Sequence, residues 1–500
     1  MKEFNGVAVF DFRIIRGKYQ IYLVKRGKDF PKYPSTWTAI TSIIFSKDVE
    51  LFNKLQEKYG EITENLLEKT TVLRILLERN LVFDPEIQTS IPLTTDNYQR
   101  ILQMDSAYLS ILFQSMIPCG SQDVLFDNAV VKTKYYLNLS STTKFYQRGN
   151  LSQHSEYFKD RKQVMEDKGH WFKTSKAIKK YAGLKATFSP SCMTFISKLH
   201  EEKKKIFEIA RYLENQISQL AFSKKGFLPN IWKFVTPAPS RTPFNMCNSY
   251  VVGNERQYII DPGSTTVKAI VQLEKYIEEN IDKIDGILLT THMVDHCNQA
   301  LRFKEKFDLP IYASEKTAEK LYDKGFFFNS YLNEGVKIYL GSYEPLGIKK
   351  WELSVIEIPG YTEGQLGYYD PRGILFSGSL IHKGVVSSID NYDGAYIDFL
   401  NSLKKVSKLK PKYILSGHRY LISNVKQAIN FSLMNFEQHE NIILNIIKDG
   451  KTSLDEIINF IFEKSKLEWR DSAVNIALFN LAKLKELEII NKRGDDFVLA

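Results

Sequence analysis

The chain has few of the residues that build metal clusters and disulfide frameworks. Its 500 residues include eight histidines and four cysteines. Cys119, Cys192, Cys247 and Cys297 stand far apart and form no C-x-x-C pair. A disulfide scaffold and a thiolate zinc finger are therefore not expected, and we predict reduced, mostly buried thiols.

Long apolar segments are also missing. No apolar run approaches the roughly 18 residues of a membrane span. The N-terminal segment lacks the order of charged, apolar and small residues that marks a secretory signal. We therefore expect a cytoplasmic protein without a membrane partner. With 43% hydrophobic residues the chain can build sizeable cores, and at ~150 residues per domain its length predicts about three domains.

The net charge of +10 is concentrated in one stretch. Residues 141–230 hold 18 lysines and arginines against 8 aspartates and glutamates, whereas residues 441–500 hold 9 basic and 10 acidic residues. Attraction to a polyanion such as RNA is therefore expected from 141–230. Its run Lys203-Lys204-Lys205 is more simply interpreted as a solvated helix face.

Three blocks follow one another and together predict an α/β protein. Residues 1–222 open with strand-like alternation in GVAVFDF and KYQIYLVKRG, continue with a helical stretch over 49–80 and end in a helix around 198–222. Residues 228–435 alternate strands with helices. The stretch 227–241 contains three prolines and is expected to be a linker.

The third block, 437–500, predicts three helices followed by a hairpin, an order that resembles a winged helix. Ser453 and Glu456 form an S-x-x-E capping box for the second helix. The apolar stripe of the third helix is expected to consist of Ala477, Leu481, Leu484 and Leu487. The residues 493–496 supply the turn of the hairpin. Since this block is slightly acidic, we expect little phosphate contact from it alone.

The middle block carries five segments that resemble the metallo-β-lactamase fold. In the order and spacing of that fold they read NSYVVGNERQYIIDPG, LLTTHMVDHCNQ, IPGYTEGQLGYY, ILFSGSL and YILSGH. With the winged-helix-like block behind it, the region 228–500 is similar to the beta-lactamase-like endoribonuclease group. The resemblance implies an αββα sandwich and a hydrolytic centre in which two metal ions activate a water.

The ligand motifs of that family are only partly present. Its T-H-x-H-x-D-H motif, aligned on the D-H end, places Thr291 and Met293 at the first two ligand positions. The later histidine position reads Tyr361, and the position of the bridging aspartate reads Ser379. The resemblance therefore implies that the first metal site and the bridge are lost.

The three terminal ligands of the second site remain, namely Asp295, His296 and His418. Two imidazoles and a carboxylate suit one zinc ion, or manganese or iron, with positions left open. Alternatively, the three side chains are remnants that form hydrogen bonds in a polar pocket.

Two further histidines lie near these motifs. His292 occupies the variable position of the first motif and would become a ligand only if the loop were one residue shorter. The gap-free alignment, in which His292 points away, is simpler. His382 follows Ser379 by three residues and is expected to be incidental.

The first block carries remnants of a magnesium-binding box. Nudix hydrolases hold Mg²⁺ with carboxylates of one helix in the pattern G-x5-E-x7-R-E-x-x-E-E-x-G. Gly60, Arg74 and Glu78 stand at box spacings here. The remaining positions have lost their box residues and read Leu66, Ile75, Arg79 and Leu81. Nudix hydrolysis is not expected, because one carboxylate would bind Mg²⁺ poorly.

Other segments extend this resemblance over 1–222. They are VKTKYYL, Trp171, the stretch 173–177 and Ser189-Pro190. Together with the box remnants they resemble the CoA-diphosphatase-like Nudix group. The resemblance implies an N-terminal Nudix-like α/β/α sandwich.

Two unrelated centres have thus lost ligands, and three functions follow as hypotheses. The first is a binding or regulatory protein that is non-catalytic or weakly active, with a nucleotide, a CoA-type molecule or RNA as its ligand. The second is a mononuclear metal-dependent hydrolase of phosphodiesters, ribonuclease-like, with Asp295, His296 and His418 on the metal and Asp295, Tyr361 or Ser379 as candidate catalytic groups. The third is RNA binding through 141–230 without chemistry.

Overall fold

The computed structural model divides into two compact units, residues 1–229 and 230–500. The residues that the structure describes are 2–15, 18–25, 36–59, 66–77, 97–103, 109, 112–113, 116–125, 129–139, 169–201, 208–213, 226, 228–237, 246–264, 267–382, 395–418, 420–450, 452–464 and 470–500. The finer division into 1–222, 228–435 and 437–500 stays a prediction.

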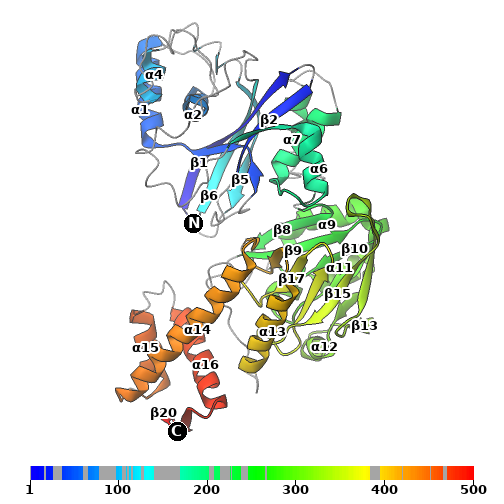
Figure 1. The fold of residues 1–500 in the computed structure, drawn as a ribbon, viewed down its shortest axis with the longest axis vertical. Coiled ribbons are helices and arrows are strands. Elements are labelled where there is room, and N and C mark those ends of the chain that lie inside the picture. Colours follow the sequence, from blue (N-terminus) through cyan, green and yellow to red (C-terminus); the bar gives the residue numbers. More distant parts are fainter. Residues whose placement is uncertain are drawn as a thin grey trace. The chain divides into compact units, whose positions relative to one another are not determined.

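The first unit is built around one mixed sheet (Figure 1). Its described strands are β1 (Lys2–Ile15), β2 (Lys18–Lys25), β3 (Trp37–Thr38), β4 (Ile40–Ile43), β5 (Met116–Leu125), β6 (Ala129–Leu139) and β7 (His170–Lys173). They follow the order β3-β2-β1-β6-β5, with β4 paired to β1 and β7 paired to β2. Strands β1 and β6 run parallel, and the two strands predicted from alternation at the start of the chain pair antiparallel.

Helices cover both faces of this sheet. They are α1 (Ser46–Tyr59), α2 (Leu66–Leu77), α4 (Asn97–Gln103), α6 (Thr174–Ala182) and α7 (Pro190–Glu201). Successive side chains of a strand point to opposite faces. Accordingly Val7 and Val9 pack with α1, α2 and α4, while Phe10 and Phe12 pack with α6 and α7. The α/β class predicted from the sequence is confirmed.

The helix predicted over 49–80 is two helices, α1 and α2, and 60–65 lie outside the described residues. The helix predicted around 198–222 is described as the end of α7 and as a helical stretch over 208–213. The run Lys203-Lys204-Lys205 lies outside the described residues.

A buried ion pair joins α2 to α1. Arg74 is 1% exposed; its Nε donates to Asp48 Oδ1 at 2.7 Å and its Nη2 to Ser42 Oγ at 3.0 Å. Asp48 Oδ2 also accepts the Phe45 N–H at 2.9 Å, which satisfies a backbone donor at the start of α1. Arg74 therefore has a structural role here. Gly60 and Glu78, the other box remnants, lie outside the described residues.

The second unit contains two larger sheets. The first has the order β13-β12-β11-β10-β9-β8 and the second the order β14-β15-β16-β17-β18. Their strands are β8 (Ile231–Pro237), β9 (Met246–Gly253), β10 (Gln257–Ile260), β11 (Ile284–Leu288), β12 (Ile311–Ala313), β13 (Ser330–Tyr331), β14 (Lys337–Tyr343), β15 (Ile348–Glu357), β16 (Leu366–Asp370), β17 (Ile374–Gly378) and β18 (Tyr413–Ser416).

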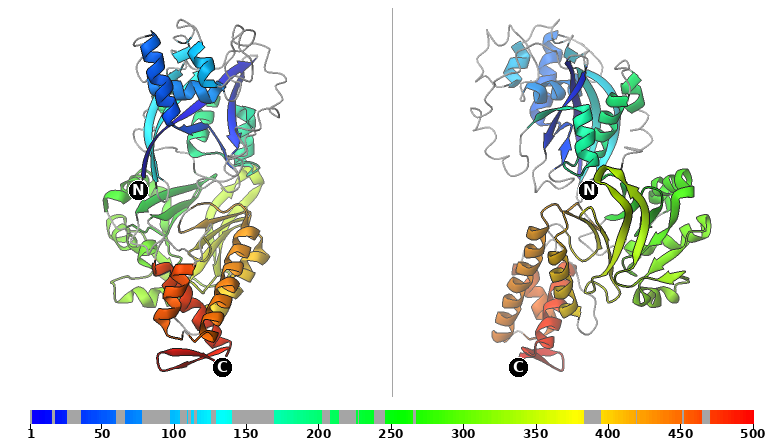
Figure 2. Two further views of the ribbon diagram at one scale, coloured as in Figure 1. Left: turned by 90° about the vertical axis from the view of Figure 1, so that its left-hand side faces the viewer. Right: turned by 45° about the vertical axis from the view of Figure 1, so that its right-hand side comes forward.

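These sheets face each other and carry helices on their outer faces, as Figures 1 and 2 show. The helices are α9 (Val267–Asn280), α10 (Val294–Cys297), α11 (Ala300–Phe307), α12 (Glu315–Tyr322), α13 (Ala395–Leu409) and α14 (Val425–Lys448). One core joins α9, α11 and α12 to the first sheet, and another joins α13 and α14 to the second. Between the sheets Tyr250 of β9 meets Phe376 of β17, with ring centroids 5.4 Å apart.

The linker predicted over 227–241 is wrong for 231–237, because these residues form β8. This strand pairs antiparallel with β9 from Ile231 to Pro237 and lies at the edge of its sheet. An edge strand tolerates proline at its ends, since one row of its backbone donors has no neighbouring strand. The prolines therefore mark an edge of the fold.

The C-terminal part contains α15 (Leu454–Lys464), α16 (Arg470–Glu486) and the hairpin β19 (Ile490–Arg493) to β20 (Asp496–Leu499). The capping box forms as predicted: the Ser453 N–H donates to Glu456 Oε2 at 3.1 Å and the Glu456 N–H to Ser453 Oγ at 3.4 Å. Ala477, Leu481 and Leu484 are buried, but Leu487 is 47% exposed because it lies beyond the end of α16. The winged-helix assignment stays a prediction.

Helix α14 is continuous through 435–437, where the sequence predicted a domain boundary. Helix α16 packs against α14, and Lys483 of α16 forms an ion pair with Glu440 of α14. The Lys483 ammonium also lies over the Tyr396 ring of α13, 4.9 Å from its centroid. Among the described residues, no helix combines the length and apolar content that crossing a bilayer requires.

Replacing Arg74 by methionine would leave the Asp48 carboxylate buried without its ion-pair partner. Removing one member of a buried pair costs about 3–5 kcal/mol. We therefore expect Arg74→Met to lower the free energy of unfolding by that amount, measured by urea denaturation. Lys132→Met is the control, because it breaks the exposed pair with Glu3 and should cost no more than about 1 kcal/mol. Equal losses from the two variants would contradict this assignment.

Candidate metal site

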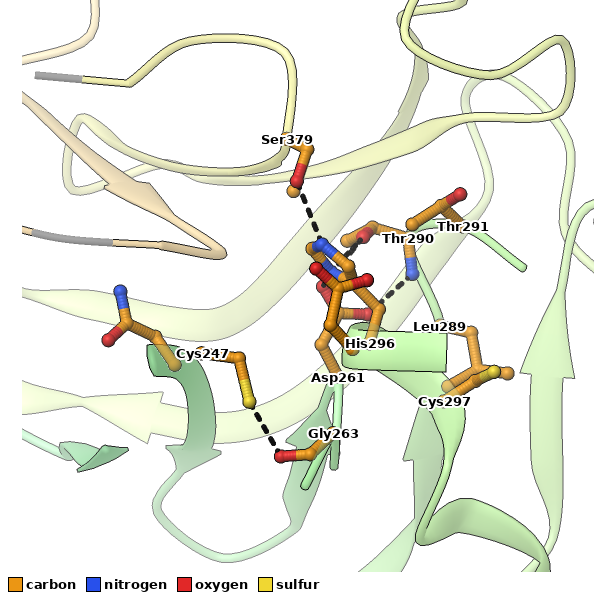
Figure 3. Close-up of polar contacts among 12 residues, drawn as sticks. Cys247, Asp261, Gly263, Leu289, Thr290, Thr291, His296, Cys297 and Ser379 are labelled. Atoms are coloured by element: carbon orange, nitrogen blue, oxygen red, sulfur yellow. Dashed lines mark hydrogen bonds and ion pairs between the residues drawn. The ribbon is translucent and has the colours of Figure 1, made fainter. Parts of the chain in front are cut away.

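The candidate site lies where strands of both sheets end. Asp261 follows β10, and the short helix α10 after β11 carries Asp295 and His296. Ser379 follows β17 and His418 follows β18. Strands β17 and β18 are parallel, with Gly378 beside Ser416, so the residues after them meet at one edge. Figure 3 shows Asp261, His296 and Ser379 in a row, joined by hydrogen bonds.

Three potential ligands converge at this edge. One donor atom from each of Asp295, His296 and His418 lies within 4.8 Å of the other two, and all three residues are buried. His418 Nε2 is 2.8 Å from Asp295 Oδ2. The structure thus brings together the three residues that the sequence proposed as a single metal site.

The outer nitrogens of both histidines are already engaged. His296 Nδ1 is 2.8 Å from Asp261 Oδ2, and His418 Nδ1 is 2.9 Å from the Met246 carbonyl oxygen. Both acceptors require a proton on Nδ1, and the Nε2 atoms face Ser379 Oγ in His296 and Asp295 Oδ2 in His418, each at 2.8 Å. Metal-binding histidines in proteins are held in this way by carboxylates and carbonyls.

Asp261 is a site residue that the sequence interpretation missed. It is 2% exposed and accepts three hydrogen bonds: from Thr290 N at 2.7 Å, from Thr290 Oγ1 at 2.6 Å and from His296 Nδ1. Its φ of 52° is left-handed, a conformation that aspartate tolerates better than most residues. The available signal was a carboxylate directly after a buried strand, in the sequence Asp-Pro-Gly.

Glycines allow the ligand-bearing segments to approach one another. A Cβ on Gly417 would lie 2.2 Å from His296 Cε1, and one on Gly263 would lie 1.7 Å from the Asp295 carbonyl oxygen. A larger residue at either position would displace a ligand-bearing residue. The backbone therefore fits the imidazole of His296 closely.

The charged groups of the site lower the pKa of Asp295 and raise the pKa of His296. Burial alone would raise the pKa of Asp295, but the nearby His296 and His418 hold it below its ordinary range. Burial alone would lower the pKa of His296, but the carboxylates of Asp261 and Asp295 raise it above its ordinary value. The Cys247 thiol donates to the Gly263 carbonyl at 2.8 Å, and burial raises its pKa to about 12, so it stays protonated at neutral pH in the metal-free protein.

The ligand positions of the first metal site are occupied by side chains that form hydrogen bonds or lie outside the ligand group. Thr291 Oγ1 is 2.9 Å from Thr362 Oγ1, and both residues are buried, so the hydroxyls satisfy each other. Met293 and Tyr361 are half-buried and do not belong to the ligand group. The bridging position is filled by Ser379, whose Oγ is 2.8 Å from His296 Nε2.

His382 lies beside the site but outside the ligand group, so the expectation that it is incidental stays a prediction. This side chain is 1% exposed, and its ring centroid is 5.4 Å from that of His418. Its Nδ1 is 2.7 Å from Ser416 Oγ, which fixes the ring beside the site. His292 is half-buried and outside the ligand group, as the gap-free alignment requires.

In metal-free protein the His296 ring should titrate with a pKa above 6.5, which NMR can measure. Its stabilising contribution is then present below pH 6.5 and is lost as pH rises through the folded-state pKa. Asp295 behaves oppositely: its folded-state pKa lies below 3.8, so its contribution is present above that value and is lost as pH falls further. Asp261→Asn should move the His296 pKa down and leave His170 of the first unit unchanged. An upward shift would contradict the assigned cause.

Comparisons with known proteins agree with this architecture. Residues 242–418 match the family model described as the metallo-beta-lactamase superfamily. An uncharacterised protein of Aquifex aeolicus (strain VF5) is 29% identical over 189 residues, which are 34% of this chain and 83% of that protein. A hydroxyacylglutathione hydrolase of Bdellovibrio bacteriovorus (strain ATCC 15356 / DSM 50701 / NCIMB 9529 / HD100) is 26% identical over 174 residues, which are 34% of this chain and 62% of the relative. The chain therefore spans less than two thirds of that hydrolase.

One solved structure is a metallo-beta-lactamase family protein of Thermus thermophilus, with 19% identity, a TM-score of 0.44 and coverage of 55% of this chain and all of the other. The family match begins just before β9 and ends at His418, so it contains the whole ligand group. It confirms the fold that five sequence segments indicated, while the Nudix-like block and the endoribonuclease group stay predictions. The chain carries a metallo-beta-lactamase superfamily domain in residues 242–418.

Proposed function

We propose that the second unit is a metal-dependent hydrolase that works with one divalent cation, held by Asp295, His296 and His418. The observation that carries this proposal is the fixed orientation of both imidazoles. Each Nδ1 is engaged by an acceptor, His418 Nε2 is 2.8 Å from Asp295 Oδ2, and one ring nitrogen of each histidine lies within 4.8 Å of the Asp295 carboxylate. A donor set of two imidazoles and one carboxylate fits zinc, manganese or iron.

The buried charge supports one cation. The site contains two buried carboxylates, those of Asp261 and Asp295. With both imidazoles neutral, one divalent cation would balance the two negative charges. The first ligand position offers no donor for a second cation, because Thr291 is hydrogen-bonded to Thr362. Burying a charge without a partner is costly, so the balance matters.

The cation, when bound, would supply Lewis acidity toward a substrate oxygen and lower the pKa of a nearby water. The chain's own residues position that chemistry. Asp261 keeps the proton of His296 on Nδ1, and the Met246 carbonyl does the same for His418. Relatives named hydroxyacylglutathione hydrolase support hydrolysis as the reaction class. The phosphodiester and ribonuclease-like substrates inferred from the sequence, and any nucleotide or CoA-type ligand, stay predictions.

Metal content decides between this hydrolase and the non-catalytic protein that the sequence favoured. After incubation with Zn²⁺, Mn²⁺ or Fe²⁺ and removal of excess metal, elemental analysis should find one equivalent in the wild type. His296→Ala and His418→Ala should lose it, because each removes one of three protein ligands. His292→Ala should keep it, since His292 lies beside the motif but outside the ligand group. A wild-type protein without metal would support the non-catalytic alternative.

A second candidate function is RNA binding by the first unit. Residues 169–200 contain six lysines and no aspartate or glutamate. Ala177 and Tyr181 of α6 are buried in the core, so Lys176 and Lys179 occupy its exposed face, and Lys173 is exposed directly before it. On a surface helix that carries charges of both signs, neighbouring side chains form ion pairs with each other. A face that carries positive charges alone attracts phosphates instead.

Charge reversal tests this second candidate. The double variant Lys176→Glu/Lys179→Glu should weaken binding of single-stranded RNA and make it less sensitive to salt, with a slope smaller by about 0.7 for each phosphate that is no longer neutralised. Lys47→Glu/Lys54→Glu on α1 carries the same charge change on another exposed face and is the control. Filter binding at several salt concentrations measures both. If the two double variants behave alike, the α6 face has no specific role in RNA binding.

A further inference from the structure

A buried histidine outside the ligand group contacts the segment that carries His418. His382 lies just after β17 and is 1% exposed. Its Nδ1 is 2.7 Å from Ser416 Oγ. Its ring centroid is 5.4 Å from that of His418, with an angle of 64° between the ring planes. His382 therefore contacts both ends of the segment 416–418.

The backbone of this segment is held by strands of both sheets. The Ser416 carbonyl accepts hydrogen bonds from Asn248 Nδ2 at 2.9 Å and from the Tyr250 hydroxyl at 2.7 Å, and both of these residues belong to β9. The Gly417 carbonyl accepts the Asn248 N–H, and the Gly417 N–H donates to the Gly378 carbonyl, each at 2.7 Å. The backbone of 416–417 is therefore fixed independently of the Ser416 side chain.

The Ser416 hydroxyl depends chiefly on His382. Its contact with His382 Nδ1 is 2.7 Å, whereas its hydrogen bonds with the Gly378 carbonyl and the His418 N–H are both 3.4 Å. Strong hydrogen bonds are typically about 2.7–3.0 Å long, so the two longer contacts are weak. Because Ser416 is 1% exposed, loss of the His382 contact would leave a buried hydroxyl poorly satisfied.

We infer that His382 is a positioning residue for His418 and that it acts through the Ser416 hydroxyl. The edge contact of the His382 ring limits how the His418 imidazole can turn, while the Met246 carbonyl fixes its Nδ1. Outer partners of this kind orient the ligands of a metal site and contribute to its affinity. The importance of this role for metal binding rests on the single-cation function proposed above.

The contact with Ser416 uses one particular nitrogen of the ring, Nδ1. The amide of asparagine ends close to the place of Nδ1 and offers both a donor and an acceptor, so it can replace either tautomer. The amide of glutamine lies one bond farther from the backbone. His382→Asn should therefore keep the contact with Ser416, whereas His382→Gln and His382→Phe should lose it.

Cobalt affinity is the first measurement. In competition with a chelating indicator, His382→Phe and Ser416→Ala should each bind Co²⁺ ~10-fold more weakly than the wild type, a loss typical of an outer partner at a metal site. Because both substitutions break the same contact, the double variant should lose no more affinity than either single variant. His382→Asn should bind Co²⁺ more tightly than His382→Gln and His382→Phe.

Ser432→Ala is the matched control. Ser432 of α14 is also 1% exposed, and its Oγ donates to the Ala428 carbonyl at 3.2 Å. This variant removes a buried serine hydroxyl of the same unit from another element, so its Co²⁺ affinity should equal that of the wild type. Circular dichroism checks folding, and Ser416→Ala carries the comparison if His382→Phe does not fold.

The second measurement needs no metal. In metal-free protein the His418 Nδ1–H, which lies 2.9 Å from the Met246 carbonyl oxygen, should give a slowly exchanging NMR signal. Its hydrogen exchange should be faster in His382→Phe and Ser416→Ala than in the wild type and Ser432→Ala, because a ring that can turn breaks this hydrogen bond.

The two possible failures are distinguishable. If folded His382→Phe and Ser416→Ala bind Co²⁺ as tightly as the wild type, or if Ser432→Ala weakens binding equally, the role of His382 is overturned and the single-cation function stands. If the folded wild type binds no Co²⁺, Zn²⁺, Mn²⁺ or Fe²⁺, the proposed function fails. Exchange of the His418 Nδ1–H then decides alone, and equal exchange in all variants overturns the positioning role.

Discussion

The carboxylate of Asp261 is the constraint on which the candidate site depends. It is buried, it accepts two hydrogen bonds from Thr290, and its third hydrogen bond fixes His296. Through Thr290 it also positions the start of the turn that carries Asp295. A buried carboxylate is stable only when its oxygens are satisfied, so the same contacts that stabilise Asp261 orient the ligands. Of the replaced ligand positions, Ser379 is hydrogen-bonded to His296, whereas Thr291 is paired with Thr362.

The sequence allowed the strands, the α/β class and the three converging ligands to be predicted, because each depends on local pattern or on spaced motifs. Asp261 was missed because its role comes from a contact 35 residues away and from a left-handed backbone conformation. The contact of His382 with His418 was not predicted, because it depends on the parallel pairing of β17 and β18. The strand β8 was taken for a linker because proline density marks sheet edges as well as loops.

The first unit shows how a motif residue can keep a structural role. Arg74 stands at a position of the Nudix box, yet its guanidinium is buried against Asp48 and Ser42 and supports the junction of α1 and α2. Its presence therefore says more about the packing of two helices than about magnesium. The lysines of α6 lie on the other face of the same sheet, where Phe10 and Phe12 pack beneath the helix pair. In this unit the lysines on the surface of α6 therefore take no part in the buried contacts of Arg74.

Helix α14 has a practical consequence for dividing the protein into parts. It contains 24 residues, a rod of about 36 Å at 1.5 Å per residue. It starts seven residues after His418 and its far half packs with α15 and α16. A truncation near residue 436 would cut this rod in the middle and expose the apolar surface that α16 covers. A fragment that keeps α14 whole must therefore extend past residue 448, and α15 and α16 are needed to cover the apolar side chains of its far half.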